Sequence, residues 1–291
     1  MKPPSFAYHD PKSVEDAVAL LGSLENAKLL AGGQSLMPML NMRFVLPDHV
    51  IDLNNIPGLA GVELHDQALV IGAMTRQREL EFSDLVATHC PILAEALLQV
   101  GHRQTRNRGT IGGSLCHLDP AAELPTLCLA LEAQVEVVGP SGPRGLMFAD
   151  FPLGYMTPAI GADELVTRIA LPLWPKGHGY AFEEFARRHG DFAIASAAVV
   201  LTLDAQGAID RVAVAIGGVC ATPMRMEAIE AALMGREPSP ELFRAATAAC
   251  KELDALGDVH APASYRQHLA GVMVRRALVR ACERASAGSK S

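Results

Sequence analysis

The sequence predicts an α+β fold in two domains, and three observations support this prediction. The chain has 291 residues, about twice the length of a usual single domain. Short apolar segments alternate irregularly with helical patterns as far as Lys176, and prolines and glycines gather around Trp174 just before it. Beyond this point two long apolar segments precede three helical stretches, a pattern typical of a small sheet covered by helices. We therefore expect domains over residues 1–176 and 177–286, followed by a tail at 287–291.

Local patterns predict the individual elements. Ser13 is a good N-cap, with Asp16 three residues later, for a helix over residues 13–24. Apolar runs bounded by turn residues predict strands at 27–32, 49–53 and 68–74. A helix is expected around 91–101, and a strand at 134–139 precedes a glycine- and proline-rich turn at 139–145. The second domain should contain strands at 193–204 and 208–219, with its helices between Pro223 and Ser286.

Composition and charge exclude several classes of function. With 49% hydrophobic and 20% charged residues, the chain is expected to form a globular core. A net charge of −7 without a large basic cluster argues against nucleic-acid binding. The N-terminus lacks an apolar leader, and no window reaches the roughly 18 apolar residues of a membrane span. These features predict a soluble, cytoplasmic protein.

The six cysteines stand singly, without C-x-x-C or zinc-type spacing, and are expected to be buried thiols. An iron–sulfur cluster bound by this chain alone is therefore disfavoured, because such clusters need four thiolates brought together. No metal site is predicted. If iron–sulfur chemistry is involved, another subunit must carry it.

A first glycine motif occurs in "LLAGGQSLMPMLNMR", residues 29–43. The preceding strand should end at Gly32 and Gly33, and Ser35 can cap a short helix that begins at Leu36. Glycine lets the backbone approach an anion closely, and the unpaired N–H groups at a helix start favour phosphate. This motif is a candidate anion-binding loop.

A second motif, "RGTIGGSLCHLDPAAELP", repeats this arrangement. Thr110 and Ser114 offer hydroxyl groups, and the Gly112–Gly113 pair is expected to expose bare backbone. Asp119-Pro120 is a good helix start, and Pro125 predicts a short turn followed by a helix through residues 127–131. Two anion-binding turns imply one extended phosphate-bearing ligand. A plain turn is the alternative for each glycine pair, and no Rossmann, Walker, zinc-protease or hydrolase signature occurs.

Taken together, these two motifs resemble the paired signatures of the FAD-binding medium subunit of molybdenum hydroxylases, which include carbon monoxide dehydrogenase and xanthine dehydrogenase. "RRHGDFAIASAAVVL" (187–201) and "AIGGVCATPMR" (215–225) extend the resemblance into the C-terminal part. It implies a two-lobed FAD-binding domain of the PCMH type, with lobes at about 1–56 and 57–176. A C-terminal domain with a three-stranded sheet and helices would follow.

The resemblance also implies an activity. A large subunit would oxidise the substrate at a molybdenum cofactor, and a small subunit would carry two [2Fe–2S] clusters. This chain would carry FAD and pass the electrons to an external acceptor, without a catalytic side chain of its own. The implied assembly is a dimer of heterotrimers.

The family's cofactor contacts fall on particular residues of this sequence. The first loop would hold the diphosphate of FAD through its backbone and comprises Ala31, Gly32, Gly33, Gln34, Ser35 and Leu36. The second motif would contribute Thr110, Gly113, Ser114 and His117, with Glu123 as an acid near the ribityl chain. A capped, solvated turn is the alternative for His117 and Glu123. Leu165 stands where a backbone contact to the flavin ring is expected.

Three residues depart from the family pattern. Phe192 stands where a tyrosine often flanks the flavin ring, so an aromatic lid there would lack the hydroxyl group, and a phenylalanine packed in the core is the alternative. Glu184 stands where some relatives have a lysine. Gln34 replaces a histidine of the carbon-monoxide-oxidising members, which favours an organic substrate such as an N-heterocycle or an aldehyde. The lack of a cysteine-rich insertion argues against the benzoyl-CoA reductase branch.

Two other functions stay open at this stage. One is a free-standing FAD-dependent oxidase or reductase, which would need its own substrate pocket. The other is a non-catalytic assembly subunit that has kept the fold. The sequence names neither the substrate nor the electron acceptor.

Overall fold

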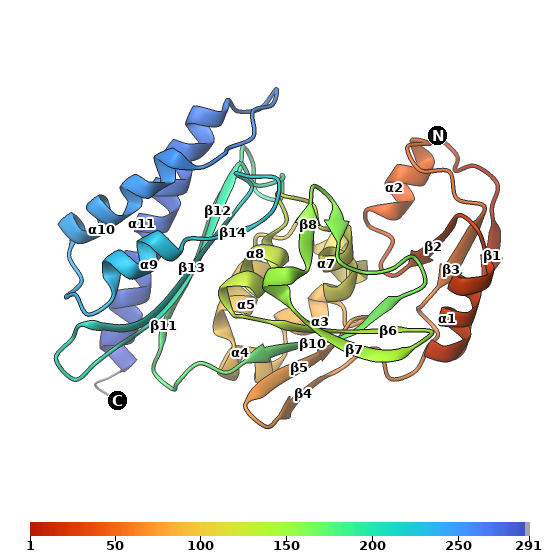
Figure 1. Ribbon diagram of the computed structural model, residues 1–291, viewed down its shortest axis with the longest axis horizontal. Helices are drawn as coiled ribbons and strands as arrows, with labels where there is room; N and C mark the ends of the chain where they lie inside the picture. The colour runs from red at the N-terminus through yellow and green to blue at the C-terminus, as the bar shows by residue number, and fades with distance from the viewer. Residues whose placement is uncertain (289–291) are drawn as a thin grey trace.

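The computed structural model describes residues 1–288, and Figure 1 shows three parts arranged along its long axis. The N-terminal lobe has a parallel sheet in the order β1-β3-β2, formed by β1 (Ala7–His9), β2 (Ala27–Leu30) and β3 (His49–Asp52). Helices α1 (Val14–Ser23) and α2 (Leu36–Asn41) complete it. The expected N-cap of α1 is confirmed, because Ser13 Oγ accepts from the Asp16 N–H at 3.0 Å.

The second lobe contains a five-stranded antiparallel sheet in the order β4-β5-β10-β6-β7. Its strands are β4 (Val62–His65), β5 (Ala68–Gly72), β6 (Gln134–Gly139), β7 (Gly142–Met147) and β10 (Leu165–Pro172). The turn expected over 139–145 is shorter, because β7 begins at Gly142 and pairs with β6. Sequence patterns did not predict β4, β7 or β10.

Six short helices accompany this sheet. They are α3 (Gln77–Glu81), α4 (Asp84–His89), α5 (Pro91–Leu97), α6 (Arg103–Arg108), α7 (Ile111–His117) and α8 (Glu123–Ala130). A 3₁₀ turn at Phe148–Asp150 leads into a small hairpin of β8 (Pro152–Gly154) and β9 (Thr157–Pro158). The helix expected through residues 127–131 is confirmed and spans Glu123–Ala130, but the turn lies before it at 120–121, and Pro125 stands inside the first turn of the helix.

The C-terminal domain follows the link that contains Lys176. Three long antiparallel strands, β11 (Gly179–Phe185), β12 (Ala195–Leu203) and β13 (Ile209–Gly217), are extended by the two-residue β14 (Met224–Arg225). Its helices are α9 (Glu227–Leu233), α10 (Pro240–Ala246) and α11 (Ala263–Gly288), with a 3₁₀ segment at Thr247–Glu252. Helix α11 covers one face of the sheet (Figure 1) and continues two residues into the expected tail, whose residues 289–291 lie outside the described part.

The alternation of side chains along β11 and β12 joins the C-terminal sheet to two separate cores. Phe182, Ala198 and Val200 pack into one core with the second lobe. Ala197 and Val199 point to the other face and pack into the core around α11. The second lobe and the C-terminal domain therefore share a continuous apolar interface. No helix among residues 1–288 is both long and apolar enough to cross a membrane.

Candidate cofactor site

The first glycine loop follows β2, and several of its backbone N–H groups are unpaired. Gly33 has φ +74°, a left-handed conformation that glycine adopts without strain. Among the described residues, no protein acceptor is found for the backbone N–H groups of Gly32, Gly33, Gln34 and Ser35. This part of the expectation is confirmed. The expected cap is wrong, because Ser35 has helical backbone angles and its side chain makes no capping hydrogen bond to α2.

The second motif is not a glycine turn. Gly112 and Gly113 lie inside helix α7, and Thr110 is its N-cap. The backbone N–H groups at the start of α7 all donate within the protein: Ile111 to Thr75 O, Gly112 to Ala73 O, Gly113 to Thr110 Oγ1 and Ser114 to Thr110 O. The expectation of bare amides here is therefore wrong. Gly112 instead permits α7 to pack closely on the segment after β5, because a Cβ on Gly112 would lie 2.6 Å from Ala73 Cβ.

The two motifs nevertheless meet in space. A Cβ placed on Gly32 would lie only 2.2 Å from the carbonyl oxygen of Arg108, at the end of α6. A Cβ placed on Gly113 would lie 3.5 Å from Ala31 Cβ. The free amides of the first loop therefore lie beside the start of α7, between the two lobes.

Hydrogen bonds of two side chains connect the first glycine loop to α6. The Asn54 side-chain amide donates to Ala31 O at 3.0 Å, and Arg76 donates both to Asn54 Oδ1 and to Arg108 O. Burial lowers the pKa of Arg76, and the neighbouring positive charge of Arg108 lowers it further. Two close guanidinium groups are stabilised by an anion between or beside them. Free amides and paired cations thus fit a diphosphate.

The other predicted residues take different positions around this junction. Ser114 and His117 lie half-buried on α7, and burial lowers the pKa of His117. Leu165 is fully buried, with its side chain in the core of the N-terminal lobe, so only its backbone is available for a contact. Phe192 is 74% exposed on the loop between β11 and β12. A Cβ on the nearby Gly190 would lie 2.5 Å from the His102 ring, which places this loop against the start of α6.

Glu123 lies at the domain interface rather than in a solvated turn. It is 7% exposed, and its pKa is raised chiefly by burial and also by the negative charge of Asp119. Glu184 of β11 lies on the face of the sheet that packs against the second lobe, and the pKa of Glu184 is raised by burial and by the charge of Glu123. The capped, solvated alternative therefore does not describe Glu123.

Sequence reasoning missed Asn54, Arg76 and Arg108 as neighbours of the loop. Arg108 directly precedes the second motif, which is a signal that could have identified it. Asn54 and Arg76 lie in separate segments, and nothing local marks them.

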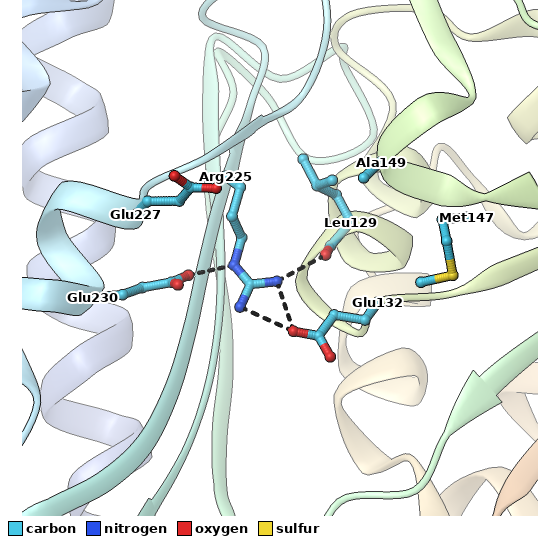
Figure 2. A pocket seen from close by; sticks show the side chains of 7 residues that line it. All are labelled: Leu129, Glu132, Met147, Ala149, Arg225, Glu227 and Glu230. Carbon is cyan, nitrogen blue, oxygen red and sulfur yellow. Dashed lines mark hydrogen bonds and ion pairs between the residues drawn. The ribbon is translucent and has the colours of Figure 1, made fainter.

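A pocket of about 270 Å³ lies elsewhere, between the second lobe and the C-terminal domain. Figure 2 shows Arg225 across it, held by Glu230 on one side and by Glu132 and the Leu129 carbonyl on the other. None of the predicted cofactor residues lines this pocket. Arg225 is paired with Glu230 of its own domain and with Glu132 of the second lobe, so the pocket contains an interdomain contact. Within residues 1–288, no group of three or more His, Cys, Asp or Glu side chains is placed to bind a metal ion.

Comparison with known proteins identifies two matching family models. The FAD-binding domain of molybdopterin dehydrogenases matches residues 4–174, and the C-terminal domain of carbon monoxide dehydrogenase flavoproteins matches residues 180–281. The 6-hydroxypseudooxynicotine dehydrogenase complex subunit alpha of Paenarthrobacter nicotinovorans is 42% identical, with 98% of this chain and 97% of that protein covered. The carbon monoxide dehydrogenase medium chain of Hydrogenophaga pseudoflava is 40% identical, with 96% and 97% covered. A solved carbon monoxide dehydrogenase structure from that organism superimposes with a TM-score of 0.95 at 42% identity, covering 98% of this chain and 99% of that one.

Proposed function

Because the chain belongs to the FAD-binding medium subunits of the molybdenum hydroxylases, we propose that it accepts electrons from a [2Fe–2S] subunit and delivers them to an external acceptor. FAD, when bound, supplies both one-electron and two-electron redox chemistry. The chain itself binds and orients the cofactor. Its proposed partners are a large molybdenum-binding subunit and a small [2Fe–2S] subunit, assembled as a dimer of heterotrimers.

One observation carries the cofactor assignment: the free amides of the first loop lie against Arg108 and beside α7. We propose that the amides of Gly32 to Ser35 hold the diphosphate, and that Arg76 and Arg108 balance its charge. The hydroxyl groups of α7 and its N-cap would line the same site. Phe192 and the Leu165 backbone would contact the flavin ring, as the family resemblance implies.

Ligand release tests the cofactor directly. The purified chain is heated, and the released ligand is identified by chromatography. FAD is expected. Release of FMN, or no bound flavin after reconstitution with FAD, would contradict the proposal. In addition, ADP should compete with FAD because it contains the diphosphate, whereas FMN should not.

A charge reversal tests the site. Arg108→Glu should weaken FAD binding roughly tenfold or more, because it replaces a cation beside the diphosphate with an anion. Arg103→Glu is the matched control, since Arg103 is also an exposed arginine on α6. Equal dissociation constants for the two variants, measured by flavin fluorescence, would place the diphosphate elsewhere.

Copurification tests the electron-transfer role. The complex should contain molybdenum and iron with FAD on this chain, and an organic substrate should reduce that FAD only in the complex. Substrate oxidation by the isolated chain would instead support a free-standing oxidase or reductase. A stable complex with a flavin-free chain would support an assembly subunit.

A further inference from the structure

An acidic pair lies in the seam where helix α8 packs on the C-terminal sheet. Glu123 is the first residue of α8, and Glu184 lies near the end of β11. Glu184 pairs in register with Ser196 of β12, which in turn pairs with Gly217 of β13. Phe182, two residues before Glu184, packs into the core shared with the second lobe. Because side chains alternate along a strand, Glu184 faces the second lobe too.

The packing in this seam is close. A Cβ placed on Gly217 would lie 2.0 Å from Thr126 Oγ1 and 2.9 Å from Ser196 Oγ. Thr126 is one turn beyond Glu123 on α8. Next to it, the Gly218 N–H donates to Pro120 O at 2.7 Å. Helix α8 therefore packs directly against the C-terminal sheet one turn from Glu123.

Two oxygen atoms in the seam lack partners. Glu184 Oε2 and Ser196 Oγ are buried, and neither has a hydrogen-bond partner within the described part of the chain. Ser196 is fully buried. Buried polar atoms are ordinarily hydrogen-bonded, so these two oxygens are free to accept a hydrogen bond from a carboxyl proton or a bound group.

The surrounding charges do not favour two carboxylates. Asp119, in the turn before α8, adds a further negative charge that raises the pKa of Glu123. The positive charge of Arg106 on α6 lowers that pKa. The strand partners of Glu184 in β12 and β13, Ser196 and Gly217, bring no charge. From α11, Arg266 binds the carbonyls of Ile194 and Gly218 instead.

We propose that Glu123 and Glu184 share one proton across the domain seam, and that this proton makes FAD binding depend on pH. With one proton, the pair carries a single negative charge and Glu184 can donate a hydrogen bond. When the proton is lost, the two carboxylates repel each other, and the added negative charge disfavours binding of the anionic cofactor. The link to FAD rests on the proposed function, whereas the shared proton does not.

The sign of the pH effect follows from burial. The pKa of both carboxyl groups is raised in the folded chain, so the folded state binds more protons than the unfolded state above an ordinary carboxyl pKa of about 4.3. The free energy of unfolding should therefore fall as pH rises above the ordinary carboxyl pKa and through the raised pKa values of the two groups. Removing one titrating group should flatten that fall.

Thermal unfolding of the purified full chain, without added FAD, tests the shared proton. Between about pH 5 and about pH 9 the wild-type midpoint should fall about 2–4 °C more than that of Glu184→Gln. Glu123→Gln should flatten the profile in the same way from the other side of the seam, and it decides the result if Glu184→Gln does not fold. Glu183→Gln is the control, because Glu183 pairs with Arg280 on the opposite face, and its profile should parallel the wild type. Parallel profiles for all four proteins would overturn the proposal.

FAD titrations test the coupling. The wild-type dissociation constant should rise at least about threefold from about pH 6 to about pH 9, and that of Glu184→Gln should stay nearly constant. An unchanged pH dependence in Glu184→Gln would overturn the coupling. If the chain binds no FAD at all, the proposed function fails, while the unfolding profiles still decide whether the proton is shared.

Discussion

At Gly32 the backbone of the N-terminal lobe comes so close to α6 that no side chain fits. The carbonyl oxygen of Arg108 occupies the place where a Cβ would stand. At Gly33 the requirement is different, because the backbone there is left-handed and its surroundings are less crowded. Adjacent glycines thus serve two purposes: one permits contact between the lobes, and the other turns the loop so that its amides are free.

Gly32→Ala should therefore destabilise the chain by about 2–4 kcal/mol, because the loop or α6 must move to relieve a backbone overlap. The measurement is urea unfolding followed by circular dichroism. Gly22→Ala on α1 is the matched control, because its Cβ would meet nothing within 4 Å. That change should stabilise α1 by about 0.5–1 kcal/mol. If Gly32→Ala is as stable as the wild type, the two lobes can separate at this point without loss of unfolding free energy.

At the scale of elements, α7 shows how a glycine pair can be misread. Glycines are poor helix formers, and the Gly112–Gly113 pair predicts a turn by local propensity. The helix forms because Thr110 caps it and because Ala73 and Thr75, which follow β5, supply carbonyl acceptors for its first amides. Only glycine lets α7 approach Ala73 this closely. Tertiary packing therefore outweighs propensity in this segment.

Thr110→Ala should cost about 0.5–2 kcal/mol of unfolding free energy, because Gly113 loses its acceptor at the start of α7. It should also weaken FAD binding, whereas Ser13→Ala should cost a similar amount by uncapping α1 without changing FAD affinity. Thr110→Ser keeps the acceptor and should restore both properties. Unfolding curves and flavin titrations measure the two effects. If Ser13→Ala weakens FAD binding as strongly, loss of stability alone explains the result.

Across the whole molecule, ion pairs connect the second lobe to the C-terminal domain. Glu95 of α5 accepts from the Phe182 N–H at 2.9 Å and pairs with Arg284 at 2.8 Å and Arg280 at 3.0 Å. Arg284 also stacks over Tyr180. These contacts fix α11 and β11 to α5 and so hold the two domains in one arrangement.

Glu95→Ala should reduce the free energy of unfolding by about 1–3 kcal/mol, because it removes the acceptor of the buried Phe182 N–H and one of the acceptors of Arg280 and of Arg284. Lys12→Ala removes an ion pair at the surface and should change stability by less than about 0.5 kcal/mol. Denaturant unfolding of both variants gives the comparison. Equal, small effects would mean that the shared apolar core alone holds the domains together.

Much of this protein was determined by sequence alone: the two-part α+β organisation, the N-cap of α1, the first glycine loop and the family resemblance carried by the two motifs. Each depends on residues close together in the chain, where capping, periodicity and turn chemistry act. Only the tertiary structure decided that Gly32 meets Arg108, that the α7 amides are already bonded, and that Glu123 and Glu184 lie buried in one seam between the domains. These contacts join distant segments, and they depend on how the lobes and sheets pack, which no local pattern encodes.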